Sequence, residues 1–383
     1  MGTSTRKHLV LAGAGHAHLT AMGRIAQLRD QGLRVTVVNS SSLHYYSGMG
    51  PGMLAGTYAP DEIRFDVRAM VESRDGEFVE DPVAGIKPEQ QVLVLASGTE
   101  LSYDCCSFNV GSGVARVPEA DAKGPEIYPV KPIIRLLDAR QRILELLDAN
   151  DKGSLTHVAV VGGGAAGIEI AGNAQALIQS APSAGPKPRV TLLAGSRLLK
   201  RFPDKVRTLA LKSLSARKID VVEDDRATGA GDGCVRLESG REIPCELVFW
   251  ATGVKPNPLF ERSGLATGPG GGLLVNQFLQ AVDHPNLFGG GDCIHFQPMA
   301  LDKVGVHAVR QNPLLAANPA ALLQGRGLMA YRASNTYLLL LNLGDGTAIF
   351  RRGSAVFRCK LAMWLKNRID TRFMQRFQKL ERA

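Results

Sequence analysis

The sequence predicts an α/β fold with two Rossmann-like dinucleotide-binding domains and a small C-terminal region that ends in a basic amphipathic helix. The first observation is a unit made of a short apolar strand, a glycine turn, a helical pattern and a second strand. This unit occurs twice, opening at His8–His18 (HLVLAGAGHAH) and at His157–Gly167 (HVAVVGGGAAG). The second observation is that 42 of the 383 residues are glycine and that they cluster in a few loops. Two such units in one chain are far more specific than a single match.

The first unit continues to a strand at Val35–Val38 (VTVV). Gly13 allows the tight turn after the opening strand, and Gly15 lets backbone N–H groups approach a pyrophosphate at the helix N-terminus. The third position of the glycine fingerprint holds His18, whose side chain must fit between helix and strand. We expect His18 to pack there, whereas for His16 packing and a bond to a phosphate are both open.

The second unit carries the complete fingerprint of Gly162, Gly164 and Gly167. It continues to a strand at Val190–Leu193 (VTLL), so its order of elements repeats that of the first unit. The same physical argument applies to it, because glycine backbone and a helix N-terminus together suit an anion. The chain therefore predicts a second dinucleotide site.

Other segments complete the two sheets and lead into the last third of the chain. Further strands are predicted at Val92–Ala96, Cys105–Val110, Glu246–Gly253 and Asn286–Asp292. The second and fourth of these end in glycines, as strands do when they return to a nucleotide. A long helix is predicted over Asp302–Leu323, interrupted by Pro313 and Pro319.

The formal net charge of +9 belongs mainly to the tail. Residues 351–383 contain ten Lys or Arg and two acids, which leaves the other 350 residues nearly neutral. Apolar residues recur there every four positions, at Leu361, Leu365, Ile369, Phe373 and Phe377, with Trp364 and Leu380 on the same side. This pattern predicts a basic amphipathic helix that lies on a membrane surface, packs on the body of the protein or contacts a second subunit. Nucleic acid is not expected, because no recognition module accompanies the charge.

Several features restrict the cellular setting. Six cysteines occur without a CxxC motif, which favours reduced intracellular thiols and gives no reason to expect a metal site. A short polar lead precedes His8, so no signal peptide is expected. No apolar run reaches the roughly 18 residues of a membrane-spanning helix. We expect a cytoplasmic protein, with peripheral attachment to the inner face of a membrane as an alternative.

Five motifs carry a resemblance to a known superfamily. They are GAGHAHL (Gly13–Leu19), YSGMGPGMLAG (Tyr46–Gly56), VKPI (Val130–Ile133), GVHAVRQNPLLAAN (Gly305–Asn318) and IDTRFMQRF (Ile369–Phe377). With the two glycine turns and the late GGGD, the chain resembles the pyridine nucleotide–disulfide oxidoreductases. Within them it resembles type II NADH dehydrogenases and sulfide:quinone reductases, and more closely the NADH dehydrogenase-like flavoproteins associated with selenide, water dikinase.

The resemblance implies that the first unit binds FAD and that the second binds NADH or NADPH as a co-substrate. It implies a discontinuous FAD-binding domain at 1–115 and 256–330, and an NAD(P)H-binding domain at 116–255. Residues 331–383 would form the region that contacts a membrane, a second copy of the chain or a partner. A homodimer is therefore one of the open alternatives.

The glycine turns and the resemblance together predict the cofactor-binding residues. These are Gly13, Gly15, His16, Ala17, His18, Asn39, Ser40, Met49, Pro51, Val83, Gly111, Ser112, Lys131, Gly162, Gly164, Ala165, Gly167, Arg197, Thr252, Gly253, Gly291 and Asp292. Asp292 would accept hydrogen bonds from the flavin ribitol, and a turn or helix-capping role is the alternative. The segment Ser47–Met53 would lie near the isoalloxazine, and residues 41–60 contain no cysteine, so a dithiol relay is not expected.

Cofactor preference depends on an acid that normally ends the second strand of each unit and binds the ribose diol. Neither unit has this acid. Asn39 or Ser40 can still bond a hydroxyl in the first unit, more weakly. In the second unit Ser196 and Arg197 can meet a 2′-phosphate, which favours NADPH, and a solvated Arg197 is the alternative.

Three residues are predicted to act in catalysis. Glu169 matches a position near the nicotinamide, and a first-turn acid stabilised by the helix dipole is the alternative. Lys303 would lie beside the helix N-terminus that faces the flavin, or extend into solvent. Gln311 lies in the helix that type II dehydrogenases present to quinone, although its neighbours Arg310 and Asn312 do not reproduce that family motif.

The expected activity is that of an FAD-dependent NAD(P)H oxidoreductase that passes a hydride to flavin and electrons on to a quinone-like acceptor. One alternative is a flavoprotein that oxidises sulfide or a selenium species. The vicinal pair Cys105-Cys106 has a strand context that favours a place in the core over a redox role. A second alternative is a flavin-bearing redox sensor or partner subunit with slow turnover.

Overall fold

The computed structural model describes residues 6–382 except 116, 120–122, 149–154 and 183–184. It contains two five-stranded parallel sheets, which confirms the predicted fold class. The first sheet has the order β21-β9-β1-β2-β5. Its strands are β1 (Lys7–Ala12), β2 (Leu33–Asn39), β5 (Glu77–Glu80), β9 (Cys105–Phe108) and β21 (Leu287–Gly289). Its last strand comes from a distant part of the chain, so residues far apart in sequence build one nucleotide-binding edge.

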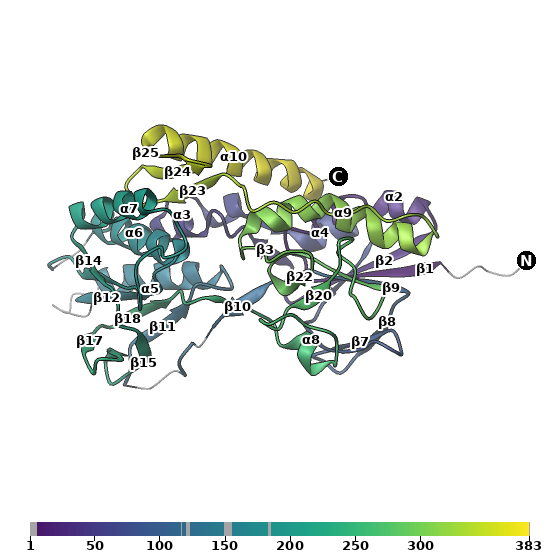
Figure 1. Cartoon of the computed structure of the whole chain (residues 1–383), viewed down its shortest axis with the longest axis horizontal. Coiled ribbons are helices and arrows are strands. Elements are labelled where there is room, and N and C mark those ends of the chain that lie inside the picture. Colours follow the sequence, from purple (N-terminus) through teal and green to yellow (C-terminus); the bar gives the residue numbers. More distant parts are fainter. Residues whose placement is uncertain (1–5, 116, 120–122, 149–154, 183–184, 383) are drawn as a thin grey trace, which may run out of the picture.

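The second sheet has the order β11-β18-β12-β13-β14. Its strands are β11 (Glu126–Pro129), β12 (His157–Val161), β13 (Arg189–Leu193), β14 (Ile219–Val222) and β18 (Leu247–Trp250). Every residue of β12 and β18 is buried, as is typical of parallel strands covered on both faces. Figure 1 shows this sheet on the left and the first sheet on the right, with β10 between them.

Smaller antiparallel sheets surround the two parallel ones. They comprise β3 (Leu43–Tyr45) with β4 (Arg64–Asp66); β6 (Val83–Lys87), β7 (Val92–Leu95) and β8 (Glu100–Ser102); β10 (Ser112–Val114) with β19 (Val254–Pro256); β15 (Ala227–Gly231), β16 (Cys234–Leu237) and β17 (Glu242–Pro244); and β23 (Leu339–Asn342), β24 (Ala348–Arg352) and β25 (Ala355–Cys359). A short parallel pair joins β20 (Leu273–Val275) to β22 (Ile294–Phe296). The β10–β19 pair links the two halves of the molecule, because β10 leaves the first sheet and β19 follows the second.

Ten α-helices lie in the described part of the chain. They are α1 (Leu19–Gly23), α2 (Ile25–Asp30), α3 (Gly50–Ala55), α4 (Val67–Glu72), α5 (Arg135–Asp148), α6 (Ala165–Ser180), α7 (Asp204–Ala216), α8 (Leu259–Arg262), α9 (Gly305–Leu323) and α10 (Lys360–Gln378). Along the described residues, none is both long and apolar enough to cross a membrane.

The predicted interruption of α9 is wrong, since the helix continues through Pro313 and Pro319. Each proline removes one backbone hydrogen bond of the helix. Tertiary contacts beside each proline hold the helix: Asn312 Oδ1 accepts a hydrogen bond from Thr20 N at 2.7 Å, and Asn318 Nδ2 donates to the carbonyl of Phe278 at 2.9 Å. Tertiary packing thus outweighs the local signal.

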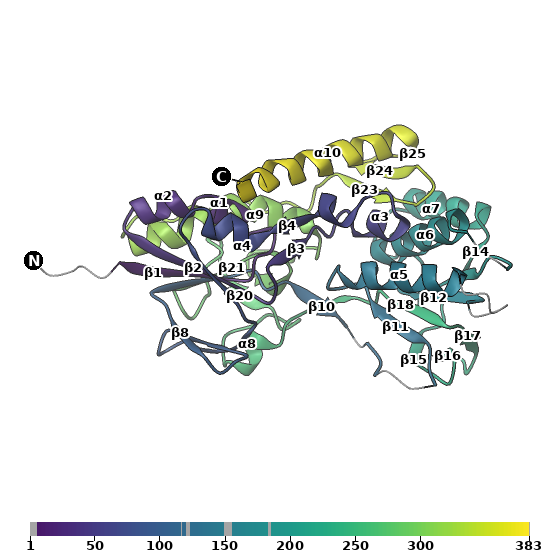
Figure 2. The ribbon, with the colours of Figure 1, turned by 180° about the vertical axis from the view of Figure 1, so that it is seen from behind.

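The C-terminal module consists of β23, β24, β25 and α10. Helix α10 lies across both halves of the molecule, as Figure 1 and the view from behind in Figure 2 show. The module meets α6 backbone to backbone: a Cβ on Gly172 would lie 2.1 Å from the carbonyl oxygen of Leu343, and a Cβ on Gly344 would lie 2.3 Å from that of Gly172. Only glycine fits at both positions, so these two residues determine how closely the module docks.

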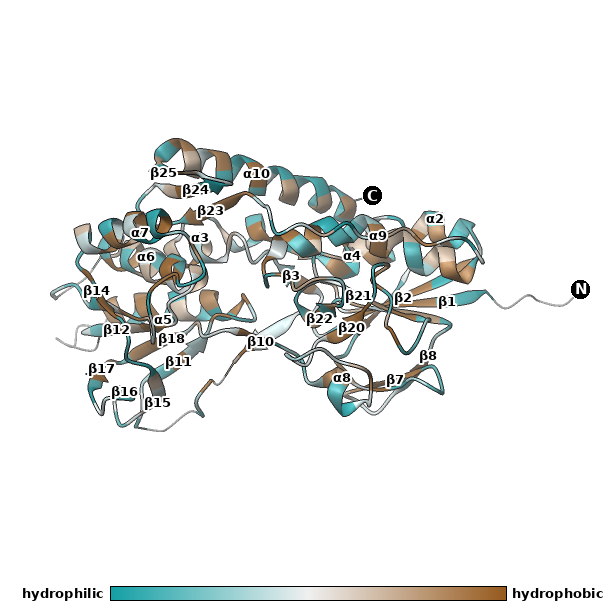
Figure 3. Ribbon diagram, viewed as in Figure 1, coloured by the Kyte–Doolittle hydropathy of each residue, from teal (hydrophilic) through white to brown (hydrophobic). Residues whose placement is uncertain are grey.

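The apolar stripe predicted on α10 does not lie on one face. Leu361, Trp364 and Ile369 are 67%, 55% and 42% exposed, whereas Phe377 is buried. The reason is geometric, because four residues turn a helix by about 40° more than a full circle. A four-residue repeat therefore drifts round the helix, and only its C-terminal part reaches the body. Figure 3 shows both hydropathy colours along the outside of α10.

Candidate functional site

The first glycine turn is closed around Asn109, which follows β9. Gly13 has a φ of +89°, and a Cβ there would lie 2.4 Å from the carbonyl oxygen of Asn109. A Cβ on Gly15 would lie 2.1 Å from the Asn109 side-chain oxygen. That oxygen accepts a hydrogen bond from Ala17 N at 3.0 Å, while Asn109 Nδ2 donates to the carbonyl of Gly290 at 2.6 Å. Sequence reasoning missed Asn109, although its place directly after a buried strand was a usable signal.

His18 packs between helix and strand, as expected. Its Nδ1 lies 2.6 Å from the carbonyl oxygen of Gly13, and its Nε2 lies 2.8 Å from Ser107 Oγ. A carbonyl only accepts, so Nδ1–H donates and Nε2 accepts from the hydroxyl. Burial lowers the pKa of His18 to about 4, so the ring is neutral at pH 7. The imidazole thus holds the helix against the turn by hydrogen bonds, where a third glycine would do so by close backbone contact.

The turn leaves donors for an anionic group. The N–H groups of residues 13, 14, 17 and 18 are bonded to the protein, whereas those of Gly15 and His16 have no partner among the described residues. These two N–H groups fit one phosphate of a dinucleotide. Asn39 has both ends of its amide engaged, with Ala14 N and with the carbonyl of Ser41. Of the two predicted ribose contacts, the exposed Ser40 hydroxyl is the one left free of that network.

A polar cluster forms where the GGGD turn meets the strand after β9. Lys131 Nζ lies 2.7 Å from Asp292 Oδ2 and 2.9 Å from Ser112 Oγ, and Ser112 Oγ lies 3.2 Å from the same carboxylate oxygen. Gly111 and Gly291 flank the cluster with φ values of +69° and +73°. Five predicted cofactor residues, distant in sequence, therefore lie together. Hydroxyl, ammonium and carboxylate groups in one place suit the hydroxyls of a ribitol chain.

Two of the predicted catalytic residues support this turn. Gln311 is fully buried, and its Oε1 accepts a hydrogen bond from Gly291 N at 2.7 Å. Its Nε2 is buried without a partner among the described residues. Lys303 is anchored, because its ammonium donates to the carbonyls of Asp292 at 3.1 Å and Ile294 at 2.5 Å. Helix α9 begins directly after it, with Val304 as the N-cap, where the sequence predicted the helix start.

The second glycine turn has the geometry of a complete fingerprint. A Cβ on Gly162 would lie 2.4 Å from the carbonyl oxygen of Ala251, and a Cβ on Gly167 would lie 1.7 Å from that of Gly162. Gly164 is the N-cap of α6, and no atom lies within 4 Å of the place its Cβ would take. Ala165 follows as the first residue of the helix. The turn therefore presents open backbone at a helix N-terminus, which fits a pyrophosphate.

Residues around the second turn complete this half of the site. Thr252 donates through its hydroxyl to the carbonyl of Ala115 at 2.5 Å, which holds the Thr252-Gly253 turn against the strand that links the halves. Arg197 lies 2.7 Å from Asp204 in an exposed ion pair. Val83, predicted to contact the flavin nucleotide, is half-buried at the start of β6 and pairs with Leu95.

A buried polar cluster joins α6, α10 and the loop before α3. Lys366 Nζ lies 2.6 Å from Asp370 Oδ2 and 2.7 Å from the carbonyl oxygen of Gly48, and Tyr46 donates to Asp370 Oδ1 at 3.1 Å. Lys366 and Asp370 are each only 6% exposed. Sequence reasoning missed both. A Lys and an Asp four positions apart inside an apolar helix pattern were the available signal.

Glu169 faces this cluster from the NAD(P)H side. Its Oε1 accepts a hydrogen bond from Asn342 N at 2.8 Å. Burial raises the pKa of Glu169 to about 7, with Lys366 acting in the opposite direction. The alternative of a first-turn acid is wrong, because the first turn of α6 carries no acid. Glu169 is instead a carboxyl group that exchanges a proton near neutral pH.

His16 lies in a cluster of rings beside the first turn. Its ring centroid is 5.0 Å from His44 and 5.1 Å from Tyr46, and Tyr46 is 5.0 Å from Phe373 of α10. Burial lowers the pKa of His16 and of His44, so both rings are neutral at pH 7. The Nε2 atoms of both histidines are buried without a partner among the described residues.

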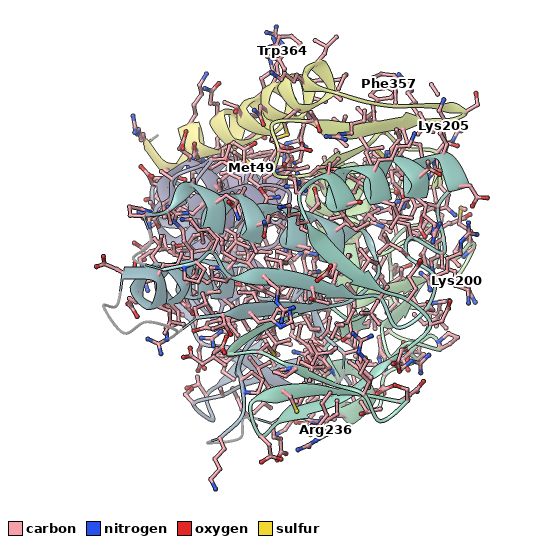
Figure 4. The ribbon with its side chains drawn as sticks, turned by 90° about the vertical axis from the view of Figure 1, so that its left-hand side faces the viewer. Met49, Lys200, Lys205, Arg236, Phe357 and Trp364 are labelled. Atoms are coloured by element: carbon pink, nitrogen blue, oxygen red, sulfur yellow. The ribbon has the colours of Figure 1, made fainter. Side chains whose placement is uncertain are left out.

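The loop before α3 completes this region. Met49, the N-cap of α3, is buried beneath α10 (Figure 4), and Pro51 is buried in the first turn of that helix. Burial of these two residues fits the predicted position of this loop beside a flavin ring. The first glycine turn, the α3 loop and α10 therefore meet in one buried region.

Two glycine turns, each at the carboxyl end of a parallel sheet, define a two-domain dinucleotide-binding oxidoreductase. The chain belongs to the pyridine nucleotide-disulphide oxidoreductase family, whose profile matches residues 7–312. Family members bind FAD and NAD(P)H, and the chain is an NAD(P)H-dependent flavin oxidoreductase.

Relatives of known name match over most of the chain. Ferroptosis suppressor protein 1 from Xenopus laevis is 26% identical over 374 residues, covering 93% of this chain and 91% of the relative. The mitochondrial external alternative NADH-ubiquinone oxidoreductase of Yarrowia lipolytica is 23% identical, covering 76% of this chain and 55% of the relative. The structure of NDH2 from Plasmodium falciparum, solved with NADH, shares the fold with a TM-score of 0.81 at 13% identity, covering 98% and 97% of the two chains. The predicted resemblance to this superfamily and to type II NADH dehydrogenases is confirmed.

Proposed function

We propose that this chain is an FAD-dependent NAD(P)H dehydrogenase that passes electrons to a quinone-like acceptor. The observation that carries the proposal is the pair of glycine turns, one in each half of the chain, in each of which two glycines leave no room for a Cβ. The chemistry that FAD would supply when bound is acceptance of a hydride from the nicotinamide and release of the electrons to a second substrate. The protein's own task is then to bind and orient the two nucleotides and to supply protons.

The binding roles follow from the contacts around each turn. The free N–H groups of Gly15 and His16 bind the FAD pyrophosphate. Asp292, Lys131 and Ser112 hold the polar chain of the flavin nucleotide, and Gln311 stabilises the turn that carries Asp292. The backbone around Gly164 binds the pyrophosphate of NAD(P)H. The β10–β19 pair joins the two halves that carry these turns.

Reduction of a quinone consumes protons as well as electrons, and the cluster around Glu169 is suited to supply them. A carboxyl group with a pKa of about 7 holds a proton below neutral pH and releases it above. The positive charge of Lys366 acts to lower the pKa of Glu169, and Lys366 itself forms an ion pair with Asp370. The naming of a Yarrowia relative as an NADH-ubiquinone oxidoreductase supports a quinone as the acceptor.

The outer face of α10 supports delivery of that acceptor from a membrane surface. Leu361 and Trp364 are 67% and 55% exposed, and Phe357 of β25 is 46% exposed. Figure 4 shows Trp364 and Phe357 on the outer side of the C-terminal module. Arg368 lies over the Trp364 ring, 5.4 Å from its centroid, and Arg372 follows one turn later. Exposed aromatic and aliphatic groups next to arginines suit the interface of an anionic bilayer.

An anaerobic titration of the flavin-loaded protein with NADH and NADPH tests the first half of the reaction. We expect either nucleotide to bleach the flavin absorbance, and a soluble ubiquinone analogue to restore it. Flavin that neither nucleotide reduces would contradict the proposal. If oxygen but not quinone reoxidises the reduced flavin, the chain would still be a dehydrogenase, and the proposal of a quinone acceptor would be wrong.

The alternative of a sulfur- or selenium-oxidising enzyme gains no support from the cysteines. Cys105 and Cys106 are fully buried in β9, as the strand context predicted, and burial raises the pKa of both thiols. A thiol held protonated in a sheet interior is a poor nucleophile. A redox sensor with slow turnover stays an outcome of the titration.

A further inference from the structure

The segment that follows β13 has no carboxylate where a nicotinamide nucleotide places its adenosine ribose. Strand β13 ends at Leu193, and residues 194–197 read Ala-Gly-Ser-Arg. In units that bind NAD an acid at this place bonds the ribose diol, whereas a nearby arginine accommodates the 2′-phosphate of NADP. The identity of these residues therefore bears directly on which donor the second turn accepts.

This segment is bound directly to the second glycine turn. A Cβ on Gly163 would lie 2.8 Å from the Cβ of Ala194, so strand end and turn are in contact. Leu199 N donates to the carbonyl of Gly163 at 2.8 Å, which holds the far end of the segment to the same turn. Arg197 therefore belongs to a loop whose two ends both contact the second glycine turn.

A second arginine lies on the other side of the segment. Gly195 has a φ of +69°, and a Cβ there would lie 3.6 Å from Cα and Cγ of Arg226. Arg226, which directly precedes β15, is thus in van der Waals range of the strand end. Arg197 belongs to this segment and Arg226 packs against Gly195, so both residues lie next to the place where the missing acid would be.

Both arginines are free to turn to an incoming anion at small cost. The Arg197–Asp204 pair has side chains 52% and 78% exposed, and the Arg226–Glu238 pair is 4.0 Å apart with side chains 60% and 59% exposed. Exposed ion pairs of this kind contribute little, because water screens them. A phosphate that takes two guanidinium groups replaces them with shorter, charge-assisted hydrogen bonds.

Besides Asp204, which pairs with Arg197, the carboxylate of Glu223 contacts the end of this segment at Leu198, and it is already engaged. Glu223 Oε1 accepts from Leu198 N at 2.5 Å, and Oε2 accepts from Arg207 Nη2 at 2.6 Å. These bonds hold the pKa of Glu223 below its usual value despite its partial burial. With both oxygens committed to the protein, Glu223 does not replace the missing acid as a ligand for the ribose diol.

We propose that this chain uses NADPH in preference to NADH, and that Arg197 and Arg226 bind the 2′-phosphate. The inference rests on the proposed function only in that the second glycine turn binds the nicotinamide nucleotide. No electron transfer is part of it, so it is open to a binding measurement. Loss of one charged hydrogen-bonding partner is expected to weaken binding about tenfold or more.

Calorimetric titration of the flavin-loaded protein with adenosine 2′,5′-bisphosphate and with 5′-AMP isolates the 2′-phosphate. We expect the bisphosphate to bind at least about thirtyfold more tightly, since two charged partners each contribute. Arg197→Ala and Arg226→Ala should each remove about tenfold of that difference and leave 5′-AMP binding unchanged. Arg236→Ala, which alters an exposed arginine of β16 paired with Asp232, is the matched control and should change neither ligand. Equal binding of the two nucleotides would overturn the proposal.

Donor kinetics separate this inference from the proposed function. We expect kcat/KM for flavin reduction to be higher with NADPH than with NADH, and Ala194→Asp to invert the order by restoring the acid. If NADH alone reduces the flavin, the specificity inference is wrong and the dehydrogenase stands. A different result would be that neither nucleotide reduces the flavin, while the bisphosphate still binds tightly and Arg226→Ala weakens its binding. The proposed dehydrogenase activity would then be wrong, and the proposed 2′-phosphate site would stand. All variants are exposed arginines or a small loop residue, and retained flavin reports that each is folded.

Discussion

His18 takes the position that glycine holds in the second unit, and the two units solve the same packing problem in different ways. At Gly167 the carbonyl of Gly162 leaves no room for a Cβ. At His18 the imidazole lies between the carbonyl of Gly13 and the hydroxyl of Ser107 and bonds both. A motif that departs from its fingerprint can thus keep the fingerprint's function when the new side chain bonds the same carbonyl.

Restoring the fingerprint is therefore expected to harm the protein. His18→Gly removes two buried hydrogen bonds and leaves the Ser107 hydroxyl without its ring partner. We expect the free energy of unfolding to fall by about 1–3 kcal/mol or more, since a buried polar group loses its partner and a cavity is left. Urea denaturation followed by fluorescence measures it. A variant as stable as the parent would show that the backbone relaxes to the glycine geometry.

We expect Glu169 to make both stability and turnover depend on pH. Its carboxyl pKa is raised to about 7 in the folded protein and is ordinary in the unfolded chain, so the folded state binds the proton more tightly. Stability from this group is therefore full at low pH and is lost as pH rises toward 7. Glu169→Gln should flatten that decline between pH 5 and pH 8, which thermal unfolding across the range measures.

The same variant should slow quinone reduction about tenfold or more and remove the inflection of its pH profile near 7, if Glu169 supplies a proton. Flavin reduction by the nucleotide serves as the internal control, since it needs no proton from the protein. An unchanged inflection would assign the pH dependence to another group.

At the scale of elements, the sequence predicted type and order better than orientation. The strands of both units and the start of α9 near Val304 follow from apolar runs and turn residues. The face of α10 that meets the body does not follow, because a four-residue spacing mimics one face while it drifts round the helix. The interruption predicted at the two prolines of α9 is also wrong because of tertiary contacts. The helix residues that precede each proline form side-chain hydrogen bonds to other segments, and the helix continues through both prolines.

The two ends of α10 are expected to respond differently to substitution. Leu361→Ser with Trp364→Ser alters exposed side chains, so stability should change by less than about 0.5 kcal/mol for each. Sedimentation with anionic phospholipid vesicles should show binding by the parent and its loss in this double variant. Phe377→Ala, at the buried end, should instead cost about 3 kcal/mol or more in stability. Equal vesicle binding by parent and double variant would assign the exposed face to a protein contact.

For the whole molecule, the C-terminal module contacts both dinucleotide-binding halves. Lys366 of α10 bonds the carbonyl of Gly48 in the first half, and Asn342 N of β23 bonds Glu169 in the second. These contacts join residues more than 170 positions apart, so no local pattern in the sequence announces them. The glycine turns were predictable because each is a contiguous motif, whereas Asn109, Lys366 and Asp370 gain their meaning only from the fold.

The docking of this module can be tested by substitution of one turn residue, with a second residue of the same turn as the control. Gly344 and Gly346 lie in the β23–β24 turn with φ values of +74° and +75°, so alanine meets the same backbone strain of about 1–2 kcal/mol at each. A Cβ on Gly344 would also lie 2.3 Å from the Gly172 carbonyl oxygen, whereas one on Gly346 would meet no atom within 4 Å.

Gly344→Ala should therefore push the turn off α6 and loosen the bond from Asn342 N to Glu169, while Gly346→Ala should not. We expect a larger loss of unfolding free energy for Gly344→Ala, by about 2 kcal/mol or more, because overpacked contacts add to the backbone strain. Its quinone reaction should also slow, with the pH inflection moved upward, since a carboxylate that loses an N–H donor holds its proton more tightly. Denaturation and pH profiles of the two variants measure both effects. If the two variants behave alike, backbone strain alone accounts for the loss, and the docking of the module does not control Glu169.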